Sequence, residues 1–178
     1  DFNIENACAA ISAARSFTVD NDAVESGLRA FTGLPHRLKF VAEKNGVKYY
    51  DDNYSSAPSA TIAAIHAFTE PEVLILGGYD KKINLSNLAI ELSHQRNLKH
   101  VVLIGQTGPQ LQELLQANGY DKVSLLDNHP SMQVIVRTAY ENASPGDIII
   151  MSPACASFDM FTNFTDRGNQ FIKAVETL

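Results

Sequence analysis

Four short apolar segments recur along the second two thirds of the chain, each bounded by glycine, aspartate or proline. They are residues 73–76, 101–104, 123–126 and 148–151. Their apolar residues run on without alternation, which is typical of strands buried on both faces of a parallel sheet. Between and after them, apolar residues recur with the three-and-four spacing of helices. This succession of strands and helices predicts an α/β domain.

A different pattern precedes these segments. Leu38, Phe40 and Ala42 are apolar residues at alternate positions, and the alternation resumes at Val47 and Tyr49. Asn45-Gly46 stands between the two stretches and is a strong signal for a type I′ turn. We therefore expect a β-hairpin to open an open, mostly parallel sheet that carries helices on both faces.

The first thirty or so residues have the spacing of two helices. The second is predicted to begin at the Asp20/Asn21 cap and to end before Gly33 and Pro35. The first is expected to turn a stripe formed by Ile4, Ala7, Cys8 and Ile11 toward a core, and the second lines up Val24, Leu28 and Phe31.

Composition narrows the class of protein. The chain has 178 residues, 45% of them hydrophobic, and a net charge of −6, which argues against disorder and against a broad nucleic-acid-binding face. Cys8 and Cys155 are too few for a disulfide scaffold, and no apolar run approaches the ~18 residues of a membrane span. A reducing cytoplasm is the expected compartment. Because the chain begins at Asp1 without a methionine, we expect it to be a piece of a longer protein.

Three loops of unusual composition follow predicted strands, at residues 51–58, 77–82 and 152–159. Open parallel sheets bind ligands at the carboxyl ends of their strands, so we expect the three loops to converge on one edge. Gly77-Gly78 with Lys81 suits an anion, or else forms a tight turn with a solvated lysine, and the chain contains no GxxxxGK[ST] motif. The residues alone thus favour an edge that binds a small anion or a nucleotide.

The remaining candidates have plainer alternatives. Asp51-Asp52 suits a metal, a ribose, or simply a polar strand end. Cys155 has no GxSxG elbow or demonstrable base nearby, and a packed small residue is favoured over a nucleophile. Asn3 and Asn6 share one face at a helix start, where capping is an alternative to ligand binding. His36 stands out among five histidines because it lies between the two architectures, and residues 105–108 are interpreted as a plain turn.

Several of these segments occur together, and in order, in a known family. They are Gly33-Leu34-Pro35-His36-Arg37, Asp51-Asp52, Gly77-Gly78-x-Asp80-Lys81, the run from Ser152 to Asp159, Asn163-Phe164 and Arg167-Gly168. On these motifs the chain resembles the C-terminal part of the Mur ligases, over essentially its whole length. The run that begins at Ser152 resembles the branch of the family that adds D-glutamate.

The resemblance implies a three-domain, ATP-dependent amide-bond ligase of peptidoglycan precursor synthesis. Residues 1–32 would be the helical end of the central ATPase domain, and residues 33–178 the C-terminal, Rossmann-like domain that brings the amino acid. ATP would convert the carboxylate of UDP-N-acetylmuramoyl-L-alanine into an acyl phosphate, which the amine of D-glutamate attacks. The Mg²⁺ ligands and the P-loop would lie upstream, so no turnover is expected from these residues alone.

The resemblance also assigns roles to residues. Those matching nucleotide-binding positions are Asn3, Asn6, Arg37 and Asp52, and those matching D-glutamate-binding positions are Ser56, Lys81, Ser157 and Phe164. No catalytic nucleophile and no metal ligand is expected here, because the attacking amine belongs to the substrate. The domain would contribute orientation, with Lys81 as its cation. Partners outside the chain would be the two missing domains, with neither nucleic acid nor membrane insertion.

Three positions depart from the family pattern. Tyr54 stands where the family usually has a lysine, Ser56 where it has a threonine, and Phe2 where it has a histidine. The loop with Tyr54 is similar to those of sister ligases. Alternatives are therefore a sister ligase or a folyl-polyglutamate synthase-like enzyme that adds another amino acid, and a nucleotide-binding module without catalysis.

Overall fold

A computed structural model describes residues 2–17, 20–127 and 129–178, although the side chains of Phe2 and Asn3 lie outside the described part. The chain divides into two compact units, residues 1–34 and 35–178. The boundary predicted from the sequence, 32/33, lies two residues earlier. Within the described residues, no helix is long and apolar enough to cross a membrane.

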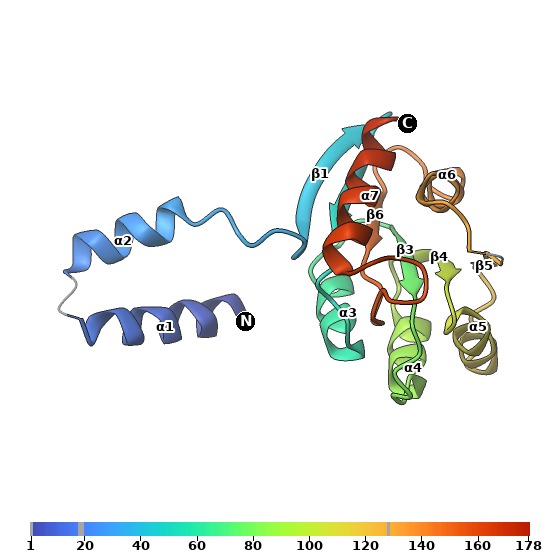
Figure 1. The fold of residues 1–178 in the computed structure, drawn as a ribbon, viewed down its shortest axis with the longest axis horizontal. Helices are drawn as coiled ribbons and strands as arrows, with labels where there is room; N and C mark the ends of the chain where they lie inside the picture. Colours follow the sequence, from blue (N-terminus) through green and yellow to red (C-terminus); the bar gives the residue numbers. More distant parts are fainter. Residues whose placement is uncertain (1, 18–19, 128) are drawn as a thin grey trace. The chain divides into compact units, whose positions relative to one another are not determined.

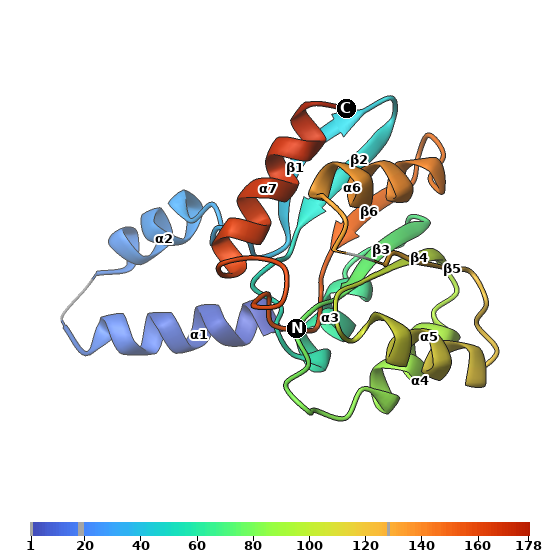
Figure 2. The same ribbon diagram turned by 45° about the vertical axis from the view of Figure 1, so that its right-hand side comes forward.

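The larger unit is a three-layer α/β domain (Figures 1 and 2). Its elements, in chain order, are β1 (Lys39–Lys44), β2 (Val47–Asp51), α3 (Pro58–Ile65), β3 (Glu72–Gly77), α4 (Ser86–His94), β4 (Leu98–Ile104), α5 (Gly108–Ala117), β5 (Val123–Leu125), α6 (Met132–Glu141), β6 (Ile148–Met151) and α7 (Phe164–Glu176). All the strands predicted from the apolar segments and the hairpin form, with β4 starting three residues early and β5 one residue shorter.

The six strands form one sheet in the order β1-β2-β6-β3-β4-β5. The hairpin strands β1 and β2 are antiparallel, and β2 joins the remaining, mutually parallel strands through β6. Asn45 and Gly46 both have positive φ, as a type I′ turn requires. The predicted fold class is confirmed: an open, mostly parallel sheet opened by a hairpin.

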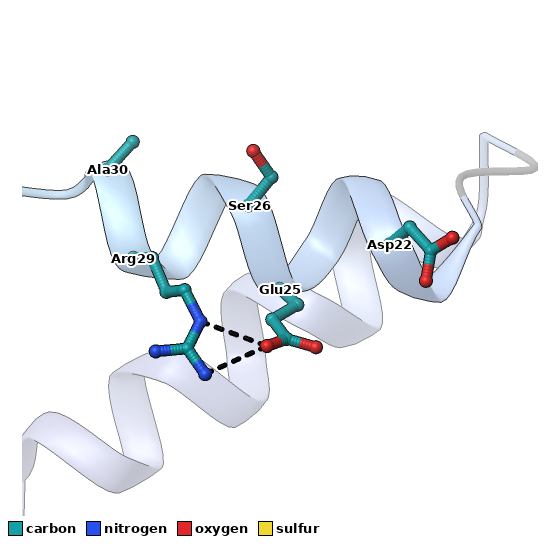
Figure 3. A pocket seen from close by; sticks show the side chains of 5 residues that line it. All are labelled: Asp22, Glu25, Ser26, Arg29 and Ala30. Atoms are coloured by element: carbon teal, nitrogen blue, oxygen red, sulfur yellow. Dashed lines mark hydrogen bonds and ion pairs between the residues drawn. The ribbon is translucent and has the colours of Figure 1, made fainter.

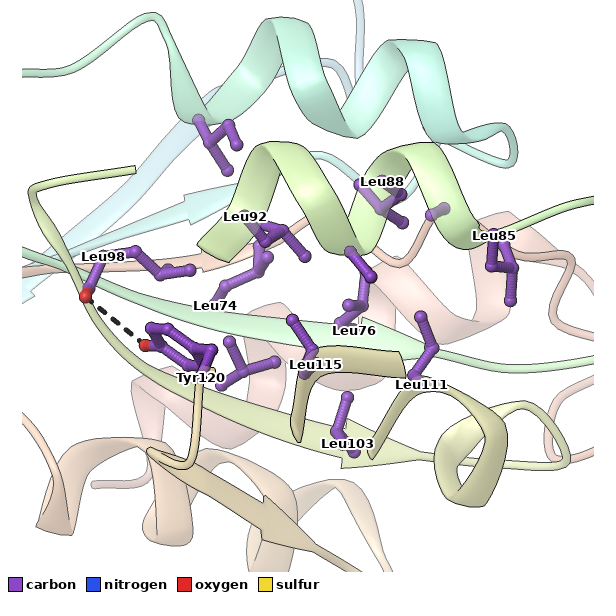
Figure 4. Packing of buried hydrophobic residues seen from close by; sticks show 14 of the residues in the cluster. Leu74, Leu76, Leu85, Leu88, Leu92, Leu98, Leu103, Leu111, Leu115 and Tyr120 are labelled. Carbon is purple, nitrogen blue, oxygen red and sulfur yellow. Dashed lines mark hydrogen bonds between the residues drawn. The ribbon is translucent and has the colours of Figure 1, made fainter. Parts of the chain in front are cut away.

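Apolar residues on both faces of the strands explain why the segments do not alternate. In β3, Leu74 and Leu76 pack with α3, α4 and α5 on one face, while Val73 and Ile75 pack with α6 and α7 on the other. Figure 4 shows the first cluster, in which leucines of α4 and α5 interdigitate with those of the strands. These two cores cover the sheet and leave the loops at its edges to carry polar groups.

The smaller unit consists of α1 (Phe2–Arg15) and α2 (Asn21–Ala30), the two helices predicted, with Asp20 capping the second. The expectation that the stripe of α1 faces a core is wrong within the described residues, since Ile4 is 62% exposed and Cys8 is exposed as well. In α2, Leu28 is 46% and Phe31 66% exposed. Two helices alone supply no further layer to cover their apolar sides. The hollow along α2 in Figure 3 is lined by Asp22, Glu25, Ser26, Arg29 and Ala30, and Arg29 and Glu25 form an exposed ion pair of 2.8 Å there.

Candidate functional site

The three loops predicted to converge do meet at the carboxyl edge of the sheet. The Gly77 N–H donates to the Pro153 carbonyl (2.9 Å), and the Tyr79 N–H donates to the Ala156 carbonyl (2.8 Å). Gly78 has φ of +149°, and a Cβ there would clash with the Ala156 carbonyl oxygen. A side chain would therefore separate two of the loops, and glycine allows them to touch.

Lys81 joins the loop after β3 to the loop after β2. Its Nζ donates to the Ser56 carbonyl at 2.6 Å, although its side chain is exposed. The neighbouring Lys82 is instead paired with Asp80, also at 2.6 Å. Of the two adjacent lysines, Lys81 is thus the one whose cation lies against another loop of the edge, beside a residue with a hydroxyl side chain.

Asp52 is buried, and protein donors hold both of its carboxylate oxygens. Oδ1 accepts from the Leu38 N–H (3.0 Å), and Oδ2 accepts from the hydroxyls of Ser55 (2.5 Å) and Ser152 (2.6 Å). Burial raises the pKa of Asp52, while these hydrogen bonds and the charge of Arg37 lower it in part. Asp52 therefore ties the loop after β2 to the end of β6 in this structure.

A second buried network begins at His36. Its Nδ1 lies 2.6 Å from Oδ2 of Asp51, and the backbone and side-chain N–H groups of Asn53 donate to Oδ1 of the same carboxylate (3.1 and 2.8 Å). His36 has φ of +58°, and Gly168 of α7 packs so closely on its ring that a Cβ would clash. The network thus anchors His36, at the start of the larger unit, to β2 and to α7.

Arg167 of α7 continues this network and is completely buried. Its Nε donates to Oδ1 of Asn53 (2.7 Å), while its terminal nitrogens donate to the carbonyls of Asn53 and Cys155 (3.2 Å each) and Ala156 (3.3 Å). Burial lowers the pKa of Arg167 to about 10, so the guanidinium keeps its charge at neutral pH. One side chain therefore connects the loop after β2 with the loop after β6.

Cys155 is a packed residue, as favoured from the sequence. Burial raises the pKa of its thiol, whose Sγ lies 3.3 Å from the Thr107 hydroxyl. Thr107 also accepts from the Gly78 N–H at 3.0 Å, so the turn after β4 belongs to the same edge. Ser157 is buried, yet its hydroxyl has no hydrogen-bond partner within the described residues. That hydroxyl is available to a ligand.

Aromatic rings line the rim of this edge. Phe164 packs edge-to-face on Tyr54, with ring centroids 5.3 Å apart, and on His36, with centroids 6.1 Å apart. Tyr79 and Phe158 form a second edge-to-face pair at 6.2 Å. Tyr54 and Phe158 are mostly exposed, so the rings present apolar surface beside the polar loops.

The predicted nucleotide-binding residues are divided between the two units. Arg37 and Asp52 lie together at the edge of the larger unit, and the exposed guanidinium of Arg37 has no hydrogen-bond partner among the described residues. Asn6 is exposed on α1 of the smaller unit, and the side chain of Asn3 lies outside the described part. No group of three or more potential metal-ligating side chains occurs in the described ranges.

Sequence reasoning assigned no role to Arg167, Asn53 or Thr107. One signal was present for Arg167, since a charged residue occupies the same helical face as Phe171 and Ala174 and must therefore be buried with them. For Asn53 and Thr107 the type of residue is ordinary for a loop, and only the contacts between loops reveal that they are structural ties.

Comparison with known sequences gives one consistent family. The profile described as "Mur ligase, glutamate ligase domain" matches residues 36–155. A UDP-N-acetylmuramoylalanine–D-glutamate ligase of Caldanaerobacter subterraneus is 42% identical over 180 residues, which cover 100% of this chain and 39% of that protein. A ligase of the same name from Bacillus cereus is 39% identical over 99% of this chain and 38% of its own length. The chain thus spans about two fifths of these relatives.

Comparison with solved structures supports the fold. A UDP-N-acetylmuramoylalanyl-D-glutamyl-2,6-diaminopimelate–D-alanyl-D-alanyl ligase from Acinetobacter baumannii superposes with a TM-score of 0.70 at 18% identity, over 99% of this chain and 37% of that one. A MurF ligase from Thermotoga maritima, solved with ADP, gives a TM-score of 0.59 at 19% identity, over 95% of this chain and 37% of that one. At these identities the likeness concerns the fold alone.

Proposed function

This chain belongs to the Mur ligase family, through its glutamate ligase domain, and on that premise we propose that it is the C-terminal part of a D-glutamate-adding ligase. The intact enzyme would use ATP to join D-glutamate to UDP-N-acetylmuramoyl-L-alanine, in the cytoplasm and as a step of peptidoglycan precursor synthesis. Residues 1–32 would be the end of its central ATPase domain, and residues 33–178 the domain that brings the amino acid.

One observation carries the amino-acid end of this proposal: Lys81 reaches across to Ser56 at the carboxyl edge (2.6 Å from Nζ to the carbonyl oxygen). D-Glutamate carries two carboxylates, which favour a cation together with hydroxyl and N–H donors. The loop with Ser157 lies against the same edge through Tyr79 and Ala156. Lys81, Ser56 and Ser157 would therefore bind the carboxylates, and Phe164 would close one side of the site.

In the larger unit, Arg37 and Asp52 would bind the nucleotide. The family resemblance gives Asn3 and Asn6 of the smaller unit the same role. The free, exposed guanidinium of Arg37 suits a phosphate. Asp52 would contact a ribose if a ribose hydroxyl replaced one of the two serine hydroxyls, of Ser55 and Ser152, that now donate to its Oδ2. The ligands of Mg²⁺ would lie in the central domain of the intact enzyme.

The chemistry asked of this domain is orientation. The amine of D-glutamate is itself the nucleophile toward the activated carboxylate, so neither Cys155 nor any serine need attack. Cys155 is unsuited to that role because burial keeps its thiol protonated. By holding both carboxylates of D-glutamate, Lys81 and the hydroxyl groups would leave the amine free to approach the activated carbonyl. Holding the two reactants in this orientation accelerates formation of the amide bond.

The proposal is tested by amino-acid selectivity in the intact ligase. ADP release is measured with UDP-N-acetylmuramoyl-L-alanine as acceptor and with D-glutamate, L-alanine or L-lysine as the added amino acid. D-Glutamate alone should support turnover, and the fragment 1–178 should support none. Turnover with another amino acid in place of D-glutamate would favour a sister ligase, and no ATP-dependent turnover with any of them would favour a non-catalytic module.

A further inference from the structure

Arg167 is a buried cation whose hydrogen-bond partners are all neutral. Within the described residues its guanidinium donates to the side chain and carbonyl of Asn53 and to the carbonyls of Cys155 and Ala156, and to no carboxylate. Burying an ion without a direct counter-ion is costly, and carbonyl partners offset the cost only in part. The guanidinium fixes the positions of the three carbonyls that it binds, and therefore also the directions of the peptide groups to which they belong.

Arg167 clamps two peptide groups, those whose carbonyls belong to Cys155 and Ala156, and so fixes their direction. In a trans peptide the N–H points opposite to the carbonyl of the same unit. Because the Ala156 carbonyl accepts from both Arg167 (3.3 Å) and the Tyr79 N–H (2.8 Å), the N–H of Ser157 points away from the buried guanidinium. Neither that N–H nor the Ser157 hydroxyl has a hydrogen-bond acceptor or partner in the part of the chain that the structure describes.

The backbone just before the clamp adopts a conformation that it would not choose by itself. Ala154 is buried and has φ of +57°, in the left-handed region that residues with a Cβ disfavour. Such a conformation persists when its surroundings determine it. The hydrogen bonds of Arg167 to the next two carbonyls provide that constraint, so a side chain without the planar fork would allow the loop to relax.

We propose that Arg167 is a positioning residue of the amino-acid site, which holds the Cys155 and Ala156 carbonyls inward so that Ser157 presents its N–H and hydroxyl to a substrate carboxylate. This inference rests on the proposed function, and it deepens it by naming the group that orients the donors.

The test compares Arg167→Lys with wild type in the intact ligase. Lysine keeps the charge but cannot reach three carbonyls in one plane, so the KM for D-glutamate should rise about ten- to a hundredfold, as expected for misplacing one charge-assisted contact. The KM for ATP should change less than about twofold, because that ligand does not use the clamped loop. Arg137→Lys is the matched control, an exposed arginine of α6 that should leave both constants unchanged.

A second measurement uses wild-type protein and so does not depend on how the variant folds. Amide hydrogen exchange of residues 152–159 is followed with and without saturating D-glutamate in the presence of ADP, and the Ser157 amide should exchange more slowly when D-glutamate is bound. Turnover with D-glutamate together with an unchanged KM in Arg167→Lys, or an unprotected Ser157 amide, would overturn the positioning role alone. Absence of any turnover with D-glutamate would overturn the proposed function and, with it, this role.

Discussion

Two sets of buried charged side chains, one at the carboxyl edge of the sheet and one at the amino edge, are arranged differently. At the carboxyl edge Asp51, Asp52 and Arg167 have every polar atom in hydrogen bonds that connect separate loops. At the amino edge, Oε1 of Glu72, the first residue of β3, accepts from the side-chain amide of Asn97 (2.6 Å), while its buried Oε2 has no hydrogen-bond partner among the described residues. Burial raises the pKa of Glu72 to about 8.

The difference separates two uses of buried polarity. A fully satisfied network over-determines the position of its members, and at the carboxyl edge those members hold the loops of the proposed ligand site. The half-satisfied carboxyl of Glu72 at the amino edge instead makes stability depend on pH. Substitutions in the network at the carboxyl edge should therefore lower the free energy of unfolding and weaken substrate binding. Substitution of Glu72 at the amino edge should change how stability depends on pH.

The largest expected effect comes from crowding the carboxyl edge with Gly168→Ala. The new Cβ would clash with the His36 imidazole, which cannot move aside because Asp51 and Phe164 hold it. We expect the free energy of unfolding to fall by about 3 kcal/mol, measured by urea denaturation. Gly27→Ala is the control, since no atom lies within 4 Å of its Cβ position and no loss of stability is expected.

Asp51→Asn should have a smaller effect at the same edge. Oδ1 of the carboxylate accepts from the N–H groups of Asn53, and Oδ2 is hydrogen-bonded to Nδ1 of His36. The side-chain amide of asparagine can accept at only one of these two positions. A loss of about 2 kcal/mol in the free energy of unfolding is expected. Asp121→Asn, at an exposed carboxyl, should leave the urea midpoint unchanged; equal midpoints for the two variants would contradict the ordering role of the network.

The amino edge gives the smallest effect, and this effect depends on pH. A carboxyl whose pKa is raised on folding binds its proton more tightly in the folded state, so stability falls as pH rises from about 4.5 to about 8. Glu72→Gln removes the titrating group. It should therefore stabilise the protein by about 1 kcal/mol at alkaline pH, relative to wild type, and not at pH 4.

Thermal unfolding across that range of pH measures the effect of Glu72→Gln, with the exposed Glu113→Gln as control. A difference between Glu72→Gln and wild type that stays constant from acidic to alkaline pH would show that Glu72 does not titrate in this window. It would also remove the contrast drawn between the two edges.

The sequence predicted the architecture better than the site because the two rest on different information. Apolar runs such as residues 148–151 report burial on both faces directly, and Asn45-Gly46 reports its turn, so strands and hairpin followed from local pattern. The helices α1 and α2 were also predicted correctly from local spacing. The exposure of their apolar residues was not predicted, because burial depends on what covers a helix.

At the site, local pattern identified which loops matter but not how they are joined. Gly77-Gly78 and Lys81 were recognisable as a turn beside a cation, while the contact with Ser56 joins residues 25 positions apart. Arg167 and Asn53 are 114 positions apart, and no local spacing predicts such a pair. The roles of individual residues came from family resemblance, and they stand as proposals.

Lys81 provides the most direct test of the proposed site. KM for D-glutamate is measured in the intact ligase for Lys81→Met and for Lys82→Met, two adjacent exposed lysines of which only the first contacts the loop after β2. Removing a cation from a carboxylate should raise the KM at least about tenfold for Lys81→Met, with the KM for ATP nearly unchanged in both variants. An unchanged KM for D-glutamate in Lys81→Met would contradict the account.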